Sequence, residues 1–421
     1  MKHLLGGIAL LLALPATPAL AQVACAPGTY AAPDGDFVVL VKSPAVAAPG
    51  LRYLFRDGRR GATTDAGVPL KCGTGDVTVG GKAWTPIAFR ETPVTFDSVG
   101  TKMTGVLIEP PGADTKRPLV VMVHGSERTS PIGGIYGYAM AAQGISVFVY
   151  DKRGTGGSEG EYTQNFELLA EDAANALGQA RSMAAGRYAR AGFFGGSQGG
   201  WVAPLAATRT KADFVAIGFG LVASPIDEDR EQMVSEVRAA GLGKDAEALV
   251  NRLSQATAGL LLSDFRIGYD KLDAVRAEMA GKPWAAKIEG EYSGAIARMP
   301  SDMLKRIGRA RVDNLELIWD YDAVAALRKL DAPLLWVLAG EDREAPIETT
   351  RGALLGLAKQ GKPVDVYLFP QTDHGMWEFT TDANGERQVT RITDGYLKLL
   401  ADWIKRDERG SYGRAERLTP R

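Results

Sequence analysis

The stretch that decides the fold reads Gly195-Gly196-Ser197-Gln198-Gly199. It lies between a short apolar run, residues 191–194, and a helix-like run, residues 201–207. A serine between glycines, where a strand turns sharply into a helix, is the pattern of a nucleophile elbow. Glycine is needed on both sides because a Cβ atom would collide where strand and helix approach each other. The pattern therefore predicts an exposed serine hydroxyl, which requires a base, an acid and an oxyanion hole elsewhere in the chain.

Short runs that are apolar on both faces recur along the chain from residue 119 onward. Such runs are typical of a sheet that is covered by helices on both sides. Helical patterns alternate with them, and Phe166–Met183 is the clearest, with its apolar residues on one face. This alternation predicts βαβ units and a mostly parallel sheet. The runs are 119–123, 145–150, 193–194, 214–219, 334–338 and 364–369, and a predicted hairpin, 93–97 and 103–109, precedes them.

The sequence predicts three further parts around this α/β core, which comprises residues 91–221 and 331–406. Residues 22–90 combine short β-branched runs with turn signals and predict a small antiparallel β domain. Residues 222–330 are too long for a structureless loop and predict an inserted helical cap. The polar tail, 407–421, is expected to be mobile. Predicted helices are 227–240, 244–261, 263–279, 301–307 and 320–330, with a final core helix over 390–405.

The N-terminus has the pattern of a secretory signal peptide. A short positive start, Met1–His3, precedes the apolar run Leu4–Leu14, and Ala-Leu-Ala ends at Ala21. The alternative is a membrane anchor, but the apolar run is much shorter than the ~20 residues that span a bilayer. We therefore expect cleavage after residue 21, a periplasmic or secreted protein, and no stable membrane span.

Export gives the two cysteines, Cys25 and Cys72, a structural meaning. In an oxidising compartment a disulfide between them is expected, and the alternative is two unpaired buried thiols. A lipoprotein modification of Cys25 is disfavoured because Gln22 stands where an apolar residue is expected. Two cysteines without a nearby histidine make no zinc site. The formal net charge of −1 gives no indication of a nucleic-acid partner.

Histidine is the usual base for a serine nucleophile, and the chain has three histidines. His3 is removed with the predicted signal peptide. His124 ends the predicted strand 119–123, whereas His374 follows the last predicted strand. This elimination predicts His374 as the base, with His124 as the remaining alternative.

The base needs a carboxylate that holds its tautomer and stabilises the imidazolium. The turn after residues 334–338 contains Glu341, Asp342 and Glu344, and we predict Asp342, with the two glutamates as competitors. Asp373 is not expected to orient the ring of its own neighbour. Two backbone amides are expected to receive the oxyanion, those of Gln198 at the helix N-terminus and of Ser126 in the loop after residues 119–123.

Four motifs in order resemble those of the α/β-hydrolase superfamily. Serine, acid and histidine follow one another in the order that this fold uses. Within it, the chain is similar to capped bacterial carboxylesterases and serine aminopeptidase-like hydrolases, some with a small N-terminal β domain. The resemblance implies that the turn at 151–154 is structural and that no metal or organic cofactor is used. The motifs are His124-Gly125-Ser126, residues 151–158, the Ser197 turn, and Asp342 followed by His374.

The sequence thus predicts a secreted serine hydrolase that cleaves small carboxylic esters through an acyl-enzyme intermediate. One alternative is a peptidase or amidase with the same triad, in which an acidic residue of the cap holds the substrate amine. The candidates for that residue are Asp227, Glu228, Asp229 and Glu231. The other alternative is a binding protein that has this fold and no activity.

Overall fold

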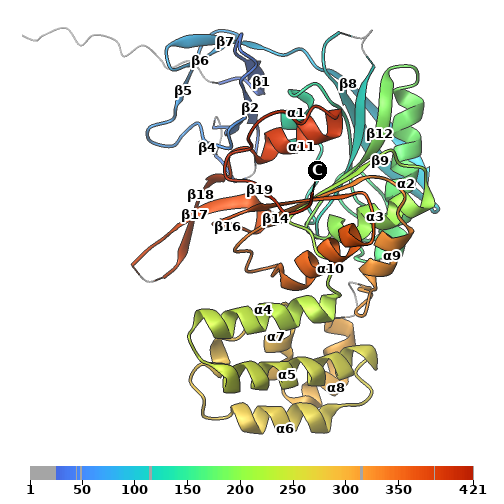
Figure 1. Cartoon of the computed structure of the whole chain (residues 1–421), viewed down its shortest axis with the longest axis vertical. Coiled ribbons are helices and arrows are strands. Elements are labelled where there is room, and N and C mark those ends of the chain that lie inside the picture. Colours follow the sequence, from blue (N-terminus) through green and yellow to red (C-terminus); the bar gives the residue numbers. More distant parts are fainter. Residues whose placement is uncertain are drawn as a thin grey trace, which may run out of the picture.

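A computed structural model of the chain describes residues 25–420, with gaps at 44, 48–49, 113–115, 313–315 and 384. The predicted signal peptide therefore lies outside the described residues. Three bodies follow one another along the molecule, namely N-terminal strands, a sheet covered by helices, and a compact group of helices (Figure 1). Among the described helices, none is both long and apolar enough to cross a bilayer.

The middle body contains a 9-stranded sheet in the order β19-β15-β14-β13-β12-β10-β11-β9-β8. The strands from β15 to β11 are parallel, and β19, β9 and β8 are antiparallel additions at the two edges. Three of the parallel strands, β11, β13 and β14, are buried along their whole length, as their apolar sequences predicted. The bounds are β8 Arg90–Ser98, β9 Thr101–Glu109, β10 Arg117–Val123, β11 Ser146–Tyr150, β12 Tyr188–Gly196, β13 Val215–Gly218, β14 Leu334–Ala339, β15 Val364–Phe369 and β19 Glu416–Arg417.

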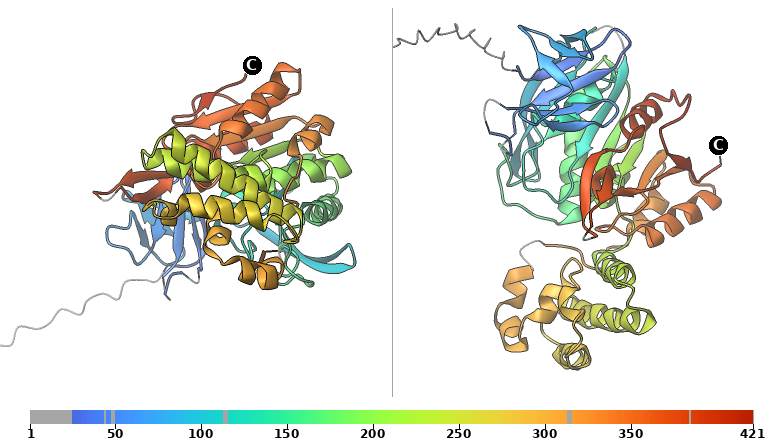
Figure 2. Two further views of the ribbon diagram at one scale, coloured as in Figure 1. Left: turned by 90° about the horizontal axis from the view of Figure 1, so that it is seen from below. Right: turned by 90° about the vertical axis from the view of Figure 1, so that its left-hand side faces the viewer.

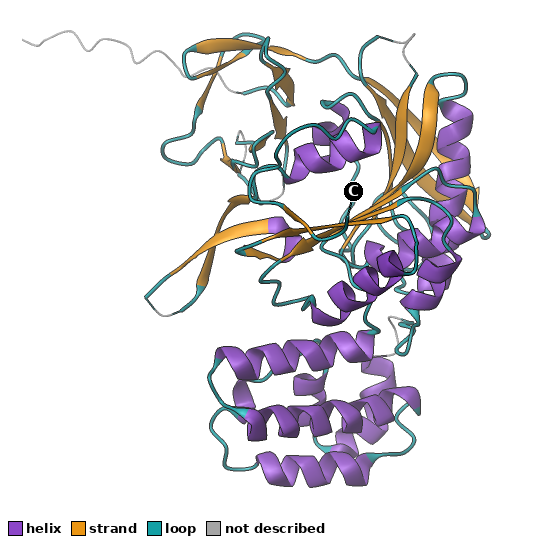
Figure 3. Cartoon of the chain, viewed as in Figure 1, coloured by secondary structure: helices purple, strands orange, loops and turns teal. Residues whose placement is uncertain are grey.

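Helices cover both faces of this sheet (Figure 3). Four helices pack on one face in one hydrophobic cluster, and the other two pack on the opposite face in a second cluster. The predicted stripe on α2 is buried from Phe166 to Ala180. The predicted α/β architecture with a mostly parallel sheet is therefore confirmed. The helices of the first face are α2 Phe166–Met183, α3 Gly199–Arg209, α9 Ala323–Lys329 and α10 Glu348–Lys359, and those of the second are α1 Ile135–Ala141 and α11 Tyr396–Lys405.

Two predictions about the C-terminal region were wrong. The last helix begins at Tyr396 instead of residue 390, because strand β18 (Arg387–Ile392) and Gly395, with φ of 87°, precede it. The tail is not free, because β19 pairs with β15 and the Val366 amide donates to the Thr419 hydroxyl at 3.1 Å. A polar strand of this kind covers backbone groups at the sheet edge that would otherwise stay unpaired.

The N-terminal strands form one 7-stranded antiparallel sheet in the order β4-β3-β2-β1-β7-β6-β5. These strands are the blue part of the ribbon in Figure 2. Its two faces are both apolar. Val38, Leu40 and Phe55 form a small core within this body, whereas Val39 and Leu54 join the cluster of α1 and α11. The predicted disulfide joins Cys25 to Cys72. The strands are β1 Gly28–Ala31, β2 Phe37–Val41, β3 Arg52–Phe55, β4 Arg60–Ala62, β5 Leu70–Cys72, β6 Val77–Val79 and β7 Lys82–Pro86.

The inserted segment is helical, as predicted, and has a hydrophobic cluster of its own. Residues 263–268 form a turn instead of the predicted helix start, and the short helix α7 was not predicted. A small sheet around His374 was also missed; it consists of β16 (Thr372–Asp373), β17 (Trp377–Thr381) and β18. The cap elements are α4 Pro225–Ala239, α5 Lys244–Leu262, α6 Tyr269–Met279, the 3-10 turn Ala285–Lys287, α7 Ser293–Arg298 and α8 Ser301–Val312.

Candidate active site

Ser197 lies at the sharp turn between β12 and α3. Its φ of 52° falls in the left-handed region, where a residue with a Cβ atom is strained. The neighbouring glycines leave no room for a side chain. A Cβ atom at Gly195 would lie 2.8 Å from the carbonyl oxygen of Gly199, and one at Gly196 would lie 2.7 Å from the Phe219 ring. The turn therefore has the geometry that the pentapeptide predicted for a nucleophile elbow.

His374 faces Ser197 from the segment that follows β15. Its Nε2 atom lies 3.1 Å from the Ser197 hydroxyl oxygen, within hydrogen-bond reach. The Phe219 ring packs edge-on against the imidazole, with 5.1 Å between ring centroids. Gly375, with φ of 73°, allows the chain to turn away directly after the histidine. The structure thus places the predicted base against the predicted nucleophile, 177 residues apart in the chain.

Asp342 holds the other side of the imidazole from the loop after β14. Its carboxylate oxygens lie 3.0 and 3.2 Å from Nδ1 of His374, and its side chain is 1% exposed. The amides of Glu344 and Ala345 donate to the same carboxylate at 3.1 and 2.7 Å. Burial alone would lower the pKa of His374, but the hydrogen bond and charge of Asp342, followed by Glu344 and Asp373, raise it. Asp342 is therefore positioned as an orienting acid.

The competing carboxylates have other partners. Glu341 forms an ion pair with Arg387 at 2.9 Å. Asp373 accepts from the backbone amide of His374 at 2.9 Å and pairs with Arg387 at 2.5 Å, so it is turned away from the ring. Glu344 does reach the site, but it lies 3.5 Å from Nε2, on the Ser197 side of the imidazole.

The two predicted oxyanion donors lie on either side of Ser197. Among the described residues, neither the Gln198 amide nor the Ser126 amide donates to a protein acceptor. A Cβ atom at Gly125 would lie 3.4 Å from the Cβ of Ser197, so the loop that carries Ser126 passes directly beside the nucleophile. Both amides are thus available to an oxyanion at this point.

Lys152 holds this loop in place, in agreement with the structural role that the resemblance implied for the turn at 151–154. Its ammonium group donates to the carbonyl oxygens of Gly125 at 2.6 Å and Glu127 at 3.3 Å, the two residues that flank Ser126. The Tyr162 hydroxyl donates to the Ser126 carbonyl at 2.5 Å. Burial lowers the pKa of Lys152 to about 8, although Glu127 opposes this shift. Three hydrogen bonds therefore hold the backbone of the predicted oxyanion loop.

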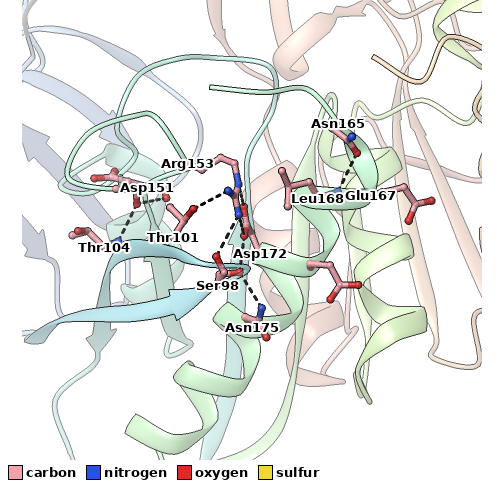
Figure 4. Close-up of polar contacts among 12 residues, drawn as sticks. Ser98, Thr101, Thr104, Asp151, Arg153, Asn165, Glu167, Leu168, Asp172 and Asn175 are labelled. Atoms are coloured by element: carbon pink, nitrogen blue, oxygen red, sulfur yellow. Dashed lines mark hydrogen bonds and ion pairs between the residues drawn. The ribbon is translucent and has the colours of Figure 1, made fainter. Parts of the chain in front are cut away.

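The rest of the turn after β11 is tied into the sheet by a buried ion pair (Figure 4). The Arg153 guanidinium forms two hydrogen bonds to Asp172 of α2, at 2.8 and 2.7 Å, and a third to Thr101 at 3.0 Å. Ser98 donates to the same carboxylate at 2.6 Å. Asp172 is 1% exposed, and a charged residue on a buried helix face is the signal that could have identified this network from the sequence.

His124 does not take part in the triad. Its ring packs edge-on against Tyr150, with 4.9 Å between centroids, and its Nδ1 lies 3.7 Å from a Glu127 carboxylate oxygen. Its Nε2 atom is buried and has no hydrogen-bond partner among the described residues. The alternative base of the sequence analysis is therefore a buried residue beside the site.

Ser197 lines two different cavities. The cap cavity has a volume of about 290 Å³ and lies between the core and the inserted helices. The α1 cavity has a volume of about 350 Å³ and lies between α1 and the oxyanion loop. The cap cavity is defined here by Glu228, Glu291, Tyr292, Trp319 and Glu344 together with Ser126 and Gln198. The α1 cavity is defined by Val123, His124, Ile135, Tyr136, Phe194, Phe219 and Tyr396.

Three carboxylates give the cap cavity its electrostatic character. Loss of hydration raises the pKa of Glu228 well above its ordinary value, and Glu291 and Glu344 raise it further. Burial raises the pKa of Glu291 to about 7, and repulsion from Glu344 and Asp229 contributes to this rise. Arg311 also lines the cavity, so three carboxyl groups and one guanidinium surround it. Three carboxyl groups favour a ligand that brings several donors or a positive charge beside them.

Of the four acidic cap residues singled out in the sequence, only Glu228 lines this cavity. Asp227 accepts from the Ser224 hydroxyl at 2.8 Å, and Glu231 is bonded to Thr349. Asp229 accepts from the backbone amides of Tyr292 and Ser293, both at 3.0 Å. Glu291 was missed because its distance in sequence from the other site residues conceals its place in the fold. In the described part of the chain, no group of His, Cys, Asp and Glu side chains could hold a metal ion.

Residues 114–377 match the family model described as serine aminopeptidase, S33. A search of curated proteins by sequence gives no match. Solved structures that resemble the chain include a Pyrococcus horikoshii acylaminoacyl peptidase, at 15% identity and a TM-score of 0.47 over 90% of this chain and 56% of that one. An esterase from Pyrococcus furiosus has 14% identity and a TM-score of 0.43, over 68% of this chain and 83% of that one. The bacterial brefeldin A esterase has 18% identity and a TM-score of 0.43, over 68% of this chain and 70% of that one.

Proposed function

The chain belongs to the serine aminopeptidase S33 family of hydrolases, and on that premise we propose that it hydrolyses carboxylic esters through an acyl-enzyme intermediate. One observation carries the proposal: Nε2 of His374 lies 3.1 Å from the Ser197 hydroxyl, and Asp342 lies 3.0 Å from Nδ1 on the other side of the ring. A nucleophile, a base and an orienting acid in this arrangement are what acyl transfer requires.

In the proposed reaction, His374 removes the proton from Ser197 while the serine oxygen attacks the acyl carbon. The amides of Gln198 and Ser126 bind the oxyanion of the tetrahedral intermediate. The C–O bond to the alcohol then breaks, and the alcohol leaves with the proton that His374 carries. Water repeats the sequence on the acyl-serine ester and releases the carboxylic acid. Asp342 stabilises the imidazolium in both halves.

Replacement of Ser197 by alanine tests this assignment. The S197A variant should lose on the order of 10⁴–10⁶-fold in kcat on a p-nitrophenyl ester and should no longer react with a fluorophosphonate probe. Ser182→Ala, at an exposed position of α2, is the matched control and should retain both. Substantial turnover by folded S197A would refute the nucleophile, and a wild-type protein inert to the probe would favour a binding protein on this fold.

We also propose that the protein is exported, with residues 1–21 removed. The signal pattern of the sequence and the Cys25–Cys72 disulfide both support an oxidising compartment. Mass spectrometry of the mature chain should find Gln22 at its N-terminus. A chain that retains Met1 in the cell envelope would instead support the membrane anchor.

A second candidate function, hydrolysis of an amide beside a substrate amine, is favoured by the carboxylates of the cap cavity. Gln198 adds an acceptor, because its side-chain Oε1 atom is buried and has no partner among the described residues, while its side-chain Nε2 atom donates to Gln164 at 3.1 Å. An aminoacyl p-nitroanilide and a neutral p-nitrophenyl ester separate the two functions. If Glu228→Gln lowers kcat/KM for the anilide by about tenfold or more and spares the ester, the amine site is supported; equal effects refute it.

A further inference from the structure

The α1 cavity on the other side of Ser197 differs in chemistry from the cap cavity. Its walls are largely apolar, with Val123, Ile135 and Phe194 among them, and Glu127 of the oxyanion loop is the carboxylate that lines it. Two buried polar atoms at this cavity, Nε2 of His124 and the Tyr396 hydroxyl, have no partner among the described residues. Buried polar groups without partners are costly, so a bound ligand or water that supplies hydrogen bonds there would be favourable. The cavity therefore has the character of a binding site.

The N-terminal sheet directs two arginines toward this side of the core. In antiparallel pairing, Arg52 lies opposite Ala62 and Arg60 lies opposite Leu54. Side chains alternate between the faces of a strand, so Arg52, Leu54 and Arg60 share one face. Leu54 is buried against α1 and α11. Both arginines thus extend from the face of the sheet that packs on the core.

Arg60 has a fixed position and an uncompensated charge. Its guanidinium lies 4.5 Å from the ring centroid of Trp377, which follows His374 by three residues. Among the described residues, neither Arg60 nor Arg52 forms an ion pair with a carboxylate. Burial lowers the pKa of Arg60, Arg52 lowers it further, and the only opposing groups are Tyr136 and Tyr53. Two unpaired cations on one face favour an anionic ligand.

Tyr136 connects the arginines to the cavity. It lines the α1 cavity, and both Arg60 and Arg52 act on its hydroxyl. Burial raises the pKa of Tyr136 to about 12, and the two guanidinium groups counteract part of this rise. Tyr136 also packs against the cluster that contains Leu54, which shares a sheet face with both arginines, so the arginines lie beside the α1 wall of the cavity. Neither arginine lines the α1 cavity itself.

We infer that the α1 cavity binds the acyl part of the substrate, and that the preferred acyl group is an apolar chain with a carboxylate at its far end, which Arg60 and Arg52 recognise. This assignment rests on the proposed serine hydrolase activity. The chain occupies the apolar walls, the terminal anion reaches the N-terminal sheet, and the leaving group occupies the acidic cap cavity. The N-terminal β domain thus contributes to substrate specificity.

Three p-nitrophenyl esters with six-carbon acyl groups test the inference. They end in a methyl group (hexanoate), a carboxylate (the adipate monoester) and an ammonium group (6-aminohexanoate). The wild-type protein should show its highest kcat/KM with the adipate monoester. Arg60→Gln should lower kcat/KM for that ester about tenfold, with a further loss in the Arg52→Gln/Arg60→Gln variant. It should leave the hexanoate within about twofold, because a neutral chain gains little from the guanidinium.

Arg59→Gln is the matched control, because it removes the same charge from the neighbouring residue. Arg59 stacks on Phe55, on the opposite face of the sheet, and pairs with Asp57. It should leave the order of the three esters unchanged. Equal losses for all three esters in Arg60→Gln, or a wild-type preference for the ammonium ester, would overturn the anion site. Failure of the wild-type protein on every ester would instead refute the proposed esterase function.

Discussion

The N-terminal β domain and the helical cap flank the same core but are joined to it by different kinds of contact. Val39 and Leu54 of the N-terminal sheet belong to one hydrophobic cluster with Met140 of α1 and Leu397 of α11. The cap has a separate cluster, centred on Leu253 of α5. Hydrogen bonds join the cap to the core, such as the one that Thr349 of α10 donates to Glu231 of α4. The two bodies lie at opposite ends of the core (Figure 1).

This difference indicates which wall of the site is fixed. An apolar interface that is continuous with the core cannot shift without losing buried area. A body with its own core and polar contacts can change its position at low cost, as in hinge movements between domains. We therefore expect the N-terminal side to define a rigid cavity, and the cap side to adapt to different leaving groups.

The largest expected effect on stability comes from truncating one buried leucine in the cluster shared by the N-terminal sheet and the core, and one in the cluster of the cap. Leu54→Ala and Leu253→Ala each remove a buried side chain and should each cost about 2–5 kcal/mol. Leu54→Ala should lower the stability of the N-terminal sheet and the core together, whereas Leu253→Ala should act on the cap alone. Urea unfolding with hydrogen–deuterium exchange, followed peptide by peptide, distinguishes these outcomes.

In Leu54→Ala, faster exchange should appear in α1 and α11 as well as in β2 and β3. In Leu253→Ala it should be confined to α4–α8. The comparison fails if Leu54→Ala loosens only the N-terminal strands, or if Leu253→Ala loosens β12 and α3 as much as the cap.

The parts of this molecule that follow from local sequence were predictable. Runs that are apolar on both faces predict the parallel strands, and the turn at Ser197 combines glycines with a strand and a helix. With three histidines in the chain, elimination favoured His374 as the base, with His124 as the alternative. The turn after β14 limited the candidates for the orienting acid to three carboxylates. Local pattern and chain order thus sufficed for the sheet and for the residues that the structure brings together at Ser197.

The remainder depends on contacts between distant segments, which no local pattern encodes. Glu291 enters the cap cavity because α7 packs on α5, and Arg60 reaches the core because of the register between β3 and β4. The tail appeared mobile because it is polar, although its backbone completes the sheet edge beside β15. In each case the sequence shows the residue but not the partner that gives it a role.

A smaller effect is expected from removing the disulfide, which stabilises only one of the two flanking bodies. A Cys25→Ser/Cys72→Ser variant should lose about 2–4 kcal/mol, because the 47-residue loop is no longer closed in the unfolded chain. Since the N-terminal sheet shares its cluster with the core, the loss should appear in the main unfolding transition. Exchange in the cap should stay unchanged. If the variant unfolds its first 90 residues in a separate early transition, the two bodies are not coupled as the shared cluster indicates.

The smallest effect concerns pH, and it separates the two sides by their charges. His374 must be neutral to accept the serine proton, so kcat/KM should fall as the pH drops through its raised pKa. Glu344 contributes to that rise, so Glu344→Gln should lower the pKa of His374 and move the acid limb of the pH profile to lower pH. Glu291→Gln should move it in the same direction and by less, because Glu291 has a pKa of about 7 and is only partly ionised there.

Arg60→Gln is the variant of the N-terminal domain whose pH profile is compared with those of the two glutamate variants. The charges of Asp342, Glu344 and Asp373 raise the pKa of His374, whereas Arg60 stacks on Trp377. Its removal should therefore leave the acid limb in place while it changes the ranking of acyl groups. The profiles are measured with the neutral hexanoate ester, so that substrate charge does not contribute. If Arg60→Gln moves the acid limb as far as Glu344→Gln does, the N-terminal domain and the cap side both act on His374. The proposed division of roles, in which the N-terminal domain selects the acyl group and the cap side adjusts the base, is then wrong. If only the glutamate variants move it, the cap side adjusts the base and the N-terminal side selects the acyl group.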